Sequence, residues 1–313
     1  MSVWTKAGIT VAVVIAAAGA FGWFVTAPKK VEAEALAAAG PGNVKAGEQI
    51  FWAAGCSSCH AAPDSKGEAQ LRLGGGVELK TAFGTFVTPN ISPDPQHGIG
   101  KWSLADFADA LTHGVDPHGR YLYPAFPYTS YTRMKLSDIA DLFAFLKTLP
   151  PVAGDPPPSR VSFPFNIRRG IGLWDVALLH PEPVVKFPPG TDPAVLRGQY
   201  LVEGPGHCGE CHTPRNAAGA TDYSQWLAGA PNPTGKGVVP NITSGKGGIG
   251  SWSAKDIAYF LESGFTPDFD TVGGDMVDVQ ANIARLPASD RAAIAAYLKA
   301  VPPKPNGYVE EKK

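Results

Sequence analysis

Two copies of one short motif constrain this chain more than any other feature of its sequence. The motif reads Cys-x-x-Cys-His, and it occupies residues 56–60 and again residues 208–212. Such a motif is typical of covalent haem attachment: its two thiols bond the two vinyl groups of one haem, and the histidine that follows lies under the iron. The motifs therefore predict two haem c groups, each with a histidine as the proximal iron ligand. The predicted haem-binding residues are Cys56, Cys59, His60, Cys208, Cys211 and His212.

Other uses of paired cysteines fit the sequence less well. The two motifs contain all 4 cysteines of the chain, so two disulfides are an alternative on number alone. A thioredoxin-like redox pair needs one Cys-x-x-Cys and makes no use of a following histidine. Zinc sites place two such pairs roughly 15–20 residues apart, whereas Cys59 and Cys208 are 149 residues apart. Haem attachment is the interpretation that uses both histidines.

The sequence around each motif is also repeated. Pro-Asn-Ile at residues 89–91 recurs at 240–242, and Gly-Ile-Gly-x-Trp-Ser at 98–103 recurs at 248–253. The offsets of these segments, 151 and 150 residues, are close to the 152 residues that separate His60 from His212. A repeat at nearly constant offset predicts two homologous domains.

Helical signals are repeated as well. Ser103 and Ser253 each have an Asp three residues later, which is a capping-box pattern. Apolar residues follow each of them at i, i+3, i+4 and i+7 spacing. A terminal helix is predicted from Ser137 in the first unit and from Ser289 in the second. Because no run of alternating apolar and polar residues predicts a strand, we expect an all-α fold.

The N-terminus predicts a membrane anchor. Residues 7–27 contain no charged side chain, and about 20 apolar residues suffice for a helix to cross a bilayer. Trp4 and Trp23 stand near the two ends, where aromatic residues meet the interface. A cleaved secretory signal is the alternative, but Pro28 directly after the candidate cleavage site disfavours it. Since haem is attached outside the bacterial cytoplasm, we expect a single-pass protein of the cytoplasmic (inner) membrane with its haem domains in the periplasm.

Two methionines are candidates for the sixth ligand of each iron. The chain has 3 methionines, and Met1 is the start, so Met134 and Met276 remain. Methionine opposite the proximal histidine raises the potential of the iron. His113 and His118 are the alternatives at the first haem. Because six-coordinate iron leaves no open position, we expect the chain itself to catalyse no substrate reaction.

Charge and the linker add two further expectations. The formal net charge is -1 and charged residues make up 18% of the chain, so nothing indicates a nucleic-acid partner. Between the two units the sequence is rich in proline, and within it residues 168–180 have apolar side chains close to helical spacing. A short amphipathic helix is predicted there.

Longer strings carry a family resemblance. They are Thr-Pro-Asn-Ile at 88–91, Gly-Arg-x-Leu-Tyr-Pro-Ala-Phe-Pro-Tyr at 119–128, and Phe-Pro-Phe-Asn at 163–166 with Trp174. Over roughly residues 44–303 the chain resembles the cytochrome c subunits of periplasmic alcohol, aldehyde and gluconate dehydrogenases and of some molybdenum hydroxylases.

The resemblance implies that the chain accepts electrons from a dehydrogenase catalytic subunit. It further implies quinone, a soluble cytochrome or a terminal oxidase as acceptor. Many relatives carry three haem motifs, whereas this chain has two, and many carry Met where this chain has Phe126. A variant with Met at the position of Met134 belongs to the same family.

Two other functions remain open at this point. One is the dihaem subunit of a haem–copper terminal oxidase, which shares the layout of one anchor and two haem domains. The other is a dihaem peroxidase, which needs one iron with an open or displaceable position.

The predicted architecture is two cytochrome c domains in tandem behind one N-terminal transmembrane helix. Its segments are an anchor (1–30), a tether (31–43), cytochrome c domain 1 (44–152), a Pro-rich linker (153–193), cytochrome c domain 2 (194–304) and a polar tail (305–313).

Overall fold

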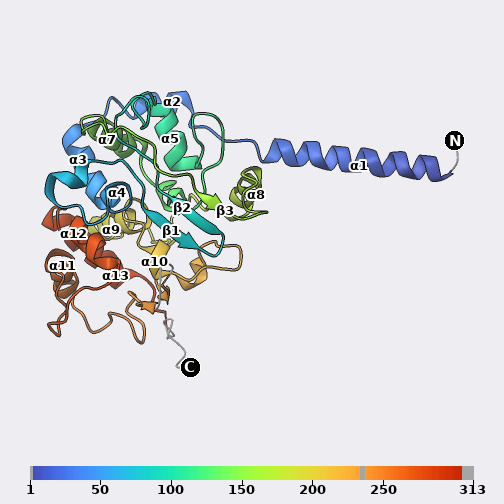
Figure 1. Cartoon of the computed structure of the whole chain (residues 1–313). Coiled ribbons are helices and arrows are strands. Elements are labelled where there is room, and N and C mark those ends of the chain that lie inside the picture. Colours follow the sequence, from blue (N-terminus) through green and yellow to red (C-terminus); the bar gives the residue numbers. More distant parts are fainter. Residues whose placement is uncertain (1–2, 233–236, 305–313) are drawn as a thin grey trace.

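A computed structural model describes residues 3–232 and 237–304. It is a mostly helical body from which helix α1 (Val3–Val25) projects away (Figure 1). Within the described residues, no helix meets the length and hydropathy that a membrane span requires, so the predicted transmembrane helix is not confirmed. The predicted polar tail and the first two residues of the predicted anchor lie outside the described residues.

The two sequence repeats form the same succession of helices. Each begins with a helix that leads into its motif and ends with a helix that packs back against the first. In the first repeat these helices are α3 (Val44–Ala53), α4 (Cys56–His60), α5 (Leu104–His113), α6 (Tyr128–Tyr131) and α7 (Leu136–Leu146). In the second they are α9 (Pro193–Glu203), α10 (Gly209–His212), α11 (Ala254–Ser263), α12 (Met276–Ile283) and α13 (Ala288–Ala300).

A glycine lets the first and last helices of each repeat cross closely. A Cβ atom on Gly47 of α3 would lie 1.9 Å from the carbonyl oxygen of Asp141 in α7. A Cβ atom on Gly198 of α9 would lie 1.9 Å from the carbonyl oxygen of Ala293 in α13. Any larger side chain would push the helices apart, so this crossing fixes the frame in which each motif is held.

The predicted helix starts are largely confirmed. Ser103 and Ser253 each form a complete capping box at the start of α5 and α11. Each of these helices ends at a left-handed glycine, Gly114 or Gly264, as is common at helix C-termini. Helices α7 and α13 begin one residue before the predicted Ser137 and Ser289.

The all-α prediction is incomplete because short strands are present. In one sheet, β2 lies between two antiparallel neighbours and brings the linker against the first repeat. A second, two-stranded sheet lies in the second repeat. Strands of two to four residues are too short to show an alternating pattern. They are β1 (Glu78–Thr81), β2 (Gly84–Val87), β3 (Arg160–Val161), β4 (Ala230–Pro231) and β5 (Val238–Val239).

Connecting segments add short helices of their own. Those outside the repeat helices are α2 (Ala33–Ala38), η1 (Gly67–Leu71), α8 (Arg169–Leu178) and η2 (Tyr223–Gln225). The segment predicted as a tether contains α2 and is fixed to the first repeat by a 2.7 Å bond from the Val31 amide to Asp109 Oδ1. The helix predicted in the linker is confirmed as α8, which buries Ile171 and Gly172.

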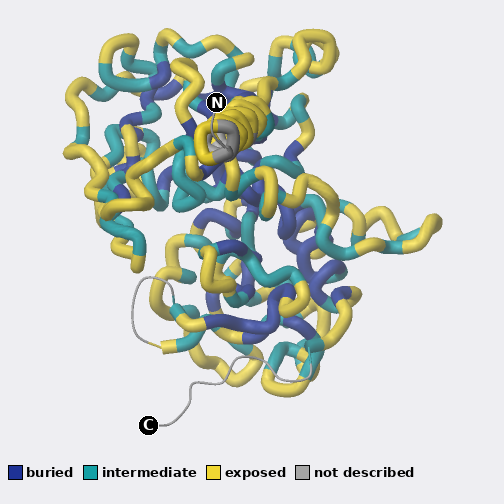
Figure 2. Tube along the Cα trace, turned by 90° about the vertical axis from the view of Figure 1, so that its right-hand side faces the viewer, coloured by how far each residue is buried: buried dark blue, intermediate teal, exposed yellow. Residues whose placement is uncertain are grey.

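The base of α1 is attached to the body through α8. The guanidinium of Arg169 lies 4.1 Å from the centre of the Trp23 ring. The hydroxyl of Tyr121 donates to the carbonyl of Thr26 at 2.9 Å. Beyond this junction the described apolar side chains of α1 are exposed, among them Ile9, Val13 and Phe21, and Figure 2 shows the helix end-on.

One continuous hydrophobic core runs through both repeats. It joins side chains of α3 and α7 with side chains of α9, α12 and α13. The two repeats are therefore packed together rather than separated by the linker.

Candidate haem-binding sites

The first motif forms helix α4 directly after α3. Gly55 adopts a left-handed conformation, with φ of 58°, and this turn separates the two helices. Nδ1 of His60 lies 2.8 Å from the carbonyl oxygen of Pro89. Since a carbonyl only accepts, Nδ1 carries the ring proton, and Nε2 is left as the nitrogen that can bind a metal.

The second motif repeats this geometry. Nδ1 of His212 lies 2.8 Å from the carbonyl oxygen of Pro240. The main chain after each histidine is also fixed in the same way, because Gly75 donates to the His60 carbonyl and Gly229 to the His212 carbonyl, both at 2.8 Å. The repeated Pro-Asn-Ile segment thus has a clear role, which is to orient the histidine of each motif.

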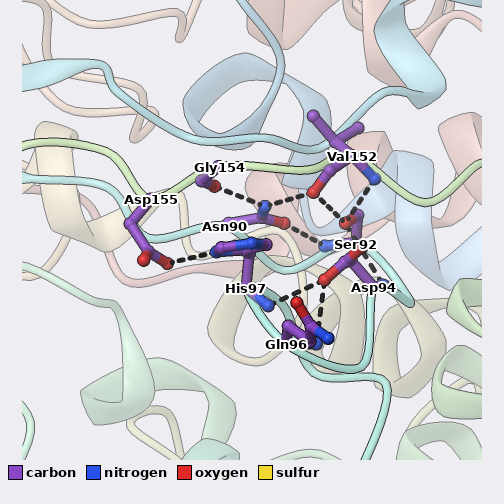
Figure 3. Close-up of polar contacts among 8 residues, drawn as sticks. All are labelled: Asn90, Ser92, Asp94, Gln96, His97, Val152, Gly154 and Asp155. Carbon is purple, nitrogen blue, oxygen red and sulfur yellow. Dashed lines mark hydrogen bonds and ion pairs between the residues drawn. The ribbon is translucent and has the colours of Figure 1, made fainter.

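The asparagine of that segment anchors the loop to the end of its repeat. Figure 3 shows Asn90 Nδ2 donating to the carbonyls of Val152 at 2.7 Å and Gly154 at 3.1 Å. Its Oδ1 accepts from the amide of Ser92 at 2.9 Å. In the second repeat, Asn241 makes the corresponding bonds to the Lys304 carbonyl and the Thr243 amide. A side chain that satisfies three main-chain groups holds the loop rigidly under the histidine.

The protonation of the motif side chains suits haem and not a thiol redox pair. Burial lowers the pKa of His60 and His212, so both rings are neutral near pH 7 and able to bind iron. Burial also raises the pKa of Cys56 and Cys208 to about 12 and that of Cys211 to about 11. Redox-active cysteines have a lowered pKa, so these thiols do not fit the thioredoxin-like alternative.

The disulfide and zinc alternatives have no counterpart among the residues that the structure describes. All 4 cysteines lie in the described part of the chain, and all are free. In residues 3–232 and 237–304 no three His, Cys, Asp or Glu side chains converge as a metal centre would require. The motif residues instead fit a group that is itself bound by two thiols and one histidine.

A cavity of about 380 Å³ lies beside the loop that holds the first histidine, and His60 itself is not among its lining residues. Pro89, whose carbonyl holds His60, is part of its wall. Ile91, Ile99 and Trp102 supply apolar surface, whereas Arg120 and Asp116, which form an ion pair at 2.7 Å, make another part of the wall polar. The fit to haem rests on the motifs: each offers two thiols and one neutral imidazole with Nε2 available.

The predicted sixth ligands do not lie at matching positions of the two repeats, since the 150-residue offset aligns Met276 with Phe126. Met134 follows α6 and is buried, and nearby Tyr131 donates its hydroxyl to the Ala54 carbonyl at 3.1 Å beside the first motif. Met276 is the first residue of α12 and is half-buried. His113, in the last turn of α5, is partly buried, and His118 is exposed at the cavity. Met134 and Met276 as ligands stay predictions.

The two motifs contact one another's repeats, which the sequence did not predict. Asn282 of α12 donates to Ser58 Oγ in the first motif at 2.8 Å. Glu210 in the second motif accepts from the hydroxyls of Thr129 at 2.6 Å and Ser130 at 2.8 Å, in the first repeat. Although burial opposes its charge, Arg215 and these hydroxyls hold the pKa of Glu210 below its usual range. In the sequence, the only signal for this contact is the acidic residue Glu210 between Cys208 and Cys211.

Comparison with known proteins agrees with this geometry. The family model for cytochrome c matches residues 44–150. The chain is 55% identical over 285 residues to a protein named "Diheme cytochrome c-type" from Cereibacter sphaeroides, covering 91% of this chain and 94% of that protein. This chain belongs to the dihaem c-type cytochrome family. The prediction of haem c as the cofactor of this cytochrome is confirmed at the level of the family.

Larger dehydrogenase subunits are also similar. The cytochrome is 37% identical over 265 residues to the fructose dehydrogenase cytochrome subunit of Gluconobacter japonicus, covering 84% of this chain and 53% of that one. It is 38% identical over 278 residues to the cytochrome c subunit of alcohol dehydrogenase (quinone) of Gluconobacter oxydans, covering 84% and 56%. The cytochrome spans about half the length of these two relatives. The predicted resemblance to dehydrogenase cytochrome subunits is confirmed.

Proposed function

We propose that this cytochrome carries electrons through two covalently bound haem c groups and catalyses no substrate reaction of its own. The observation that carries the proposal is the pair of motif histidines, each held by its Nδ1 against a proline carbonyl at 2.8 Å. Because both repeats hold the histidine in the same way, the two histidines are expected to have the same role. That task is to present a fixed, neutral imidazole to an iron.

Each side chain of the motif has a defined part. The thiols of Cys56 and Cys59, and those of Cys208 and Cys211, would each add across a vinyl double bond, with the sulfur on one carbon and the thiol hydrogen on the other. His60 and His212 would bind the irons from one side, and Met134 and Met276 from the other. Bound in this way, haem supplies reversible one-electron chemistry.

The meeting of the two motifs supports transfer between the haems. The contacts of Asn282 with Ser58 and of Glu210 with Thr129 join each motif to the opposite repeat. An electron that enters at one haem would therefore travel only a short distance to the other.

We propose the catalytic subunit of a periplasmic dehydrogenase as electron donor. The support is the similarity to subunits of fructose and alcohol dehydrogenases. Quinone, a soluble cytochrome or a terminal oxidase would accept the electrons.

For location, we propose the periplasmic side of the cytoplasmic membrane. The support is the uncharged stretch at residues 7–27 and the position of α1, which projects from the body (Figure 1). The aromatic side chains of this helix, Trp4, Phe21, Trp23 and Phe24, are exposed. Carbonate washing of native membranes tests this proposal. A chain that remains with the membrane supports it, and a chain that is released contradicts it.

Purification from native membranes in mild detergent tests the proposed function. We expect two haems per chain by pyridine haemochrome assay, and a co-purifying dehydrogenase whose substrate reduces both. Co-purification of a haem–copper oxidase core would favour that alternative instead. Peroxide-dependent turnover by the isolated protein would contradict the proposed lack of catalysis.

A further inference from the structure

The residue directly before each motif has a left-handed main chain, but its type differs between the repeats. It is Gly55 in the first repeat, with φ of +58°, and His207 in the second, with φ of +37°. The 152-residue offset between the motifs places these two residues at matching positions. Glycine adopts this conformation without strain, whereas a side chain with a Cβ atom does so at a cost. A contact of the His207 side chain is therefore expected to offset the cost.

The His207 side chain makes this contact with the other repeat. Its Nε2 lies 3.2 Å from the carbonyl oxygen of Ala54, which stands two residues before Cys56. Burial lowers the pKa of His207, so the ring is neutral near pH 7 and carries one proton. Since a carbonyl only accepts, that proton is on Nε2. The strained residue before the second motif thus donates to the segment that leads into the first motif.

Tyr131 of the first repeat shares the same acceptor. Its hydroxyl donates to the Ala54 carbonyl at 3.1 Å, and a carbonyl oxygen has two lone pairs to accept both bonds. The rings of Tyr131 and His207 also meet edge to face, with centroids 5.7 Å apart and planes at 72°. We call Ala54, Tyr131 and His207 the Ala54 junction. It holds the two repeats together at the point where both motifs begin.

The Ala54 junction connects two haem-binding cysteines by a short path. His207 is joined to Cys208 by a peptide bond, and its ring is hydrogen-bonded to Ala54. From Ala54 the main chain continues through Gly55 to Cys56. The path therefore contains one hydrogen bond and is otherwise covalent. Electron tunnelling weakens less along bonds than across gaps between atoms, so such a path favours transfer.

The other two contacts of the motifs do not form such a path. Asn282 joins Ser58 of the first motif to α12, and Glu210 joins the second motif to Thr129 of α6. Each of them attaches one motif to a helix of the other repeat. The Ala54 junction differs because it joins the residues that lead directly into both motifs.

We propose that the Ala54 junction fixes the two haems relative to one another and couples them electronically, with His207 and Tyr131 as positioning residues. This inference rests on the proposed electron-transfer function and names the residues through which electrons pass between the two haems. Both residues act through the main chain of the first motif, and neither is a predicted iron ligand.

The test uses the full-length protein with its haems and two measurements. Pulse radiolysis reduces one haem rapidly and follows the redistribution of the electron to the other. Circular dichroism in the Soret region shows an exciton couplet that depends on the separation and mutual orientation of the two haems. Potentiometric titration of the same samples checks that the driving force is unchanged, so that a slower transfer reports weaker coupling.

His207→Gly is the main variant. It should slow transfer between the haems by about tenfold and reduce the exciton couplet by roughly half, because the two motifs lose their direct link. The Tm should change little, since relief of the left-handed strain offsets the lost hydrogen bond. The Ala54 carbonyl keeps the bond from Tyr131, so no buried acceptor is left without a partner.

Further variants separate the hydrogen bond from the loss of a ring. His207→Gln places an amide nitrogen the same number of bonds from Cα as Nε2, and it should restore most of the transfer rate and of the couplet. Tyr131→Phe keeps the ring and removes only the hydroxyl, so its effect should be smaller than that of His207→Gly. His180→Gly is the matched control, because His180 also meets a tyrosine ring edge to face, at 5.2 Å from Tyr223, but lies exposed in the linker. It should behave like the wild type.

The proposal is overturned if His207→Gly keeps two haems and shows the transfer rate and couplet of the wild type, or if His207→Gln is as impaired as His207→Gly. Loss of a haem from either His207 variant would show that this residue serves haem attachment, and would also overturn the proposal. Fewer than two haems in the wild type would contradict the proposed function. Two haems in the wild type with unaltered transfer in the variants would contradict only the role of the Ala54 junction.

Discussion

The two repeats are alike around the motif histidine and unlike around the predicted sixth ligand. Both histidines donate to a proline carbonyl, and both asparagine loops hold the end of their repeat. Of the two methionines, one is buried after α6 and the other is half-exposed at the start of α12. The turn before them carries Gly119 in one repeat and Phe269 in the other. The features common to both repeats orient the motif histidine, and those that differ lie around the two predicted sixth ligands.

Removing one haem at a time should produce the largest effect. We expect C56S/C59S and C208S/C211S each to reduce the haem content from two per chain to one. Because one core runs through both repeats, each loss should also lower the Tm of the other repeat. Pyridine haemochrome assay and calorimetry check this. Two separate transitions, with the untouched repeat melting as in the wild type, would show that the repeats are independent.

Replacing the predicted sixth ligands should separate the two haems electrochemically. Met134→Leu and Met276→Leu keep the size and apolar character of the side chain but remove the sulfur. Each should lower the potential of one haem only, by on the order of 100 mV, because a weaker ligand replaces the thioether. Potentiometric titration followed in the visible spectrum measures both potentials. If Met134→Leu changes neither and His113→Gln or His118→Gln changes one, a histidine is the ligand of the first iron.

Among the contacts between the repeats, that of Glu210 is charged and that of Asn282 is neutral. We expect this difference to appear in the free energy of unfolding. Glu210→Ala leaves the hydroxyls of Thr129 and Ser130 without their acceptor and Arg215 without its carboxylate. We expect it to cost about 2–3 kcal/mol, and Asn282→Ala, which loses neutral hydrogen bonds, about 1 kcal/mol. Urea unfolding of the haem-loaded chain provides the comparison. Equal losses would mean that the buried charge adds nothing to the contact.

Sequence reasoning succeeded where a side chain acts on its own segment. Ser103 and Ser253 start their helices through a capping box that joins residues only three positions apart. Apolar spacing located α8 because its register shows within ten residues. Strands β3 to β5 could not be predicted, because two residues cannot display a period. Strand β3 is stabilised by its pairing with β2, which lies far from it in sequence.

The cross-repeat contacts needed information that the sequence lacks. Glu210 finds Thr129 and Ser130 only because the two repeats pack with their motifs facing one another. His207 is a different case, since aligning the motifs places it opposite Gly55. Its strain becomes visible only when both positions are known to be left-handed.

The smallest expected effect concerns Tyr128, which is bonded to a residue of the linker. The matching position of the second repeat is Asp278, which cannot make the same tyrosine bond. Tyr128 donates to Asp175 Oδ1 at 2.7 Å, and burial raises the pKa of Asp175 to about 6. The folded chain therefore binds more protons than the unfolded chain between about pH 4 and pH 6, and stability contributed by this group is lost as the pH rises through that window.

Asp175→Asn keeps an acceptor for Tyr128 and removes the titration. We expect it to flatten the dependence of the unfolding free energy on pH by on the order of 1 kcal/mol, a value discounted because the side chain is partly exposed. Urea midpoints from pH 4 to pH 7 measure this, with the exposed Glu34→Gln as control. An unchanged slope in Asp175→Asn would mean that Asp175 titrates in the fold as it does in the unfolded chain, and that the linker contact contributes no pH dependence to the first repeat.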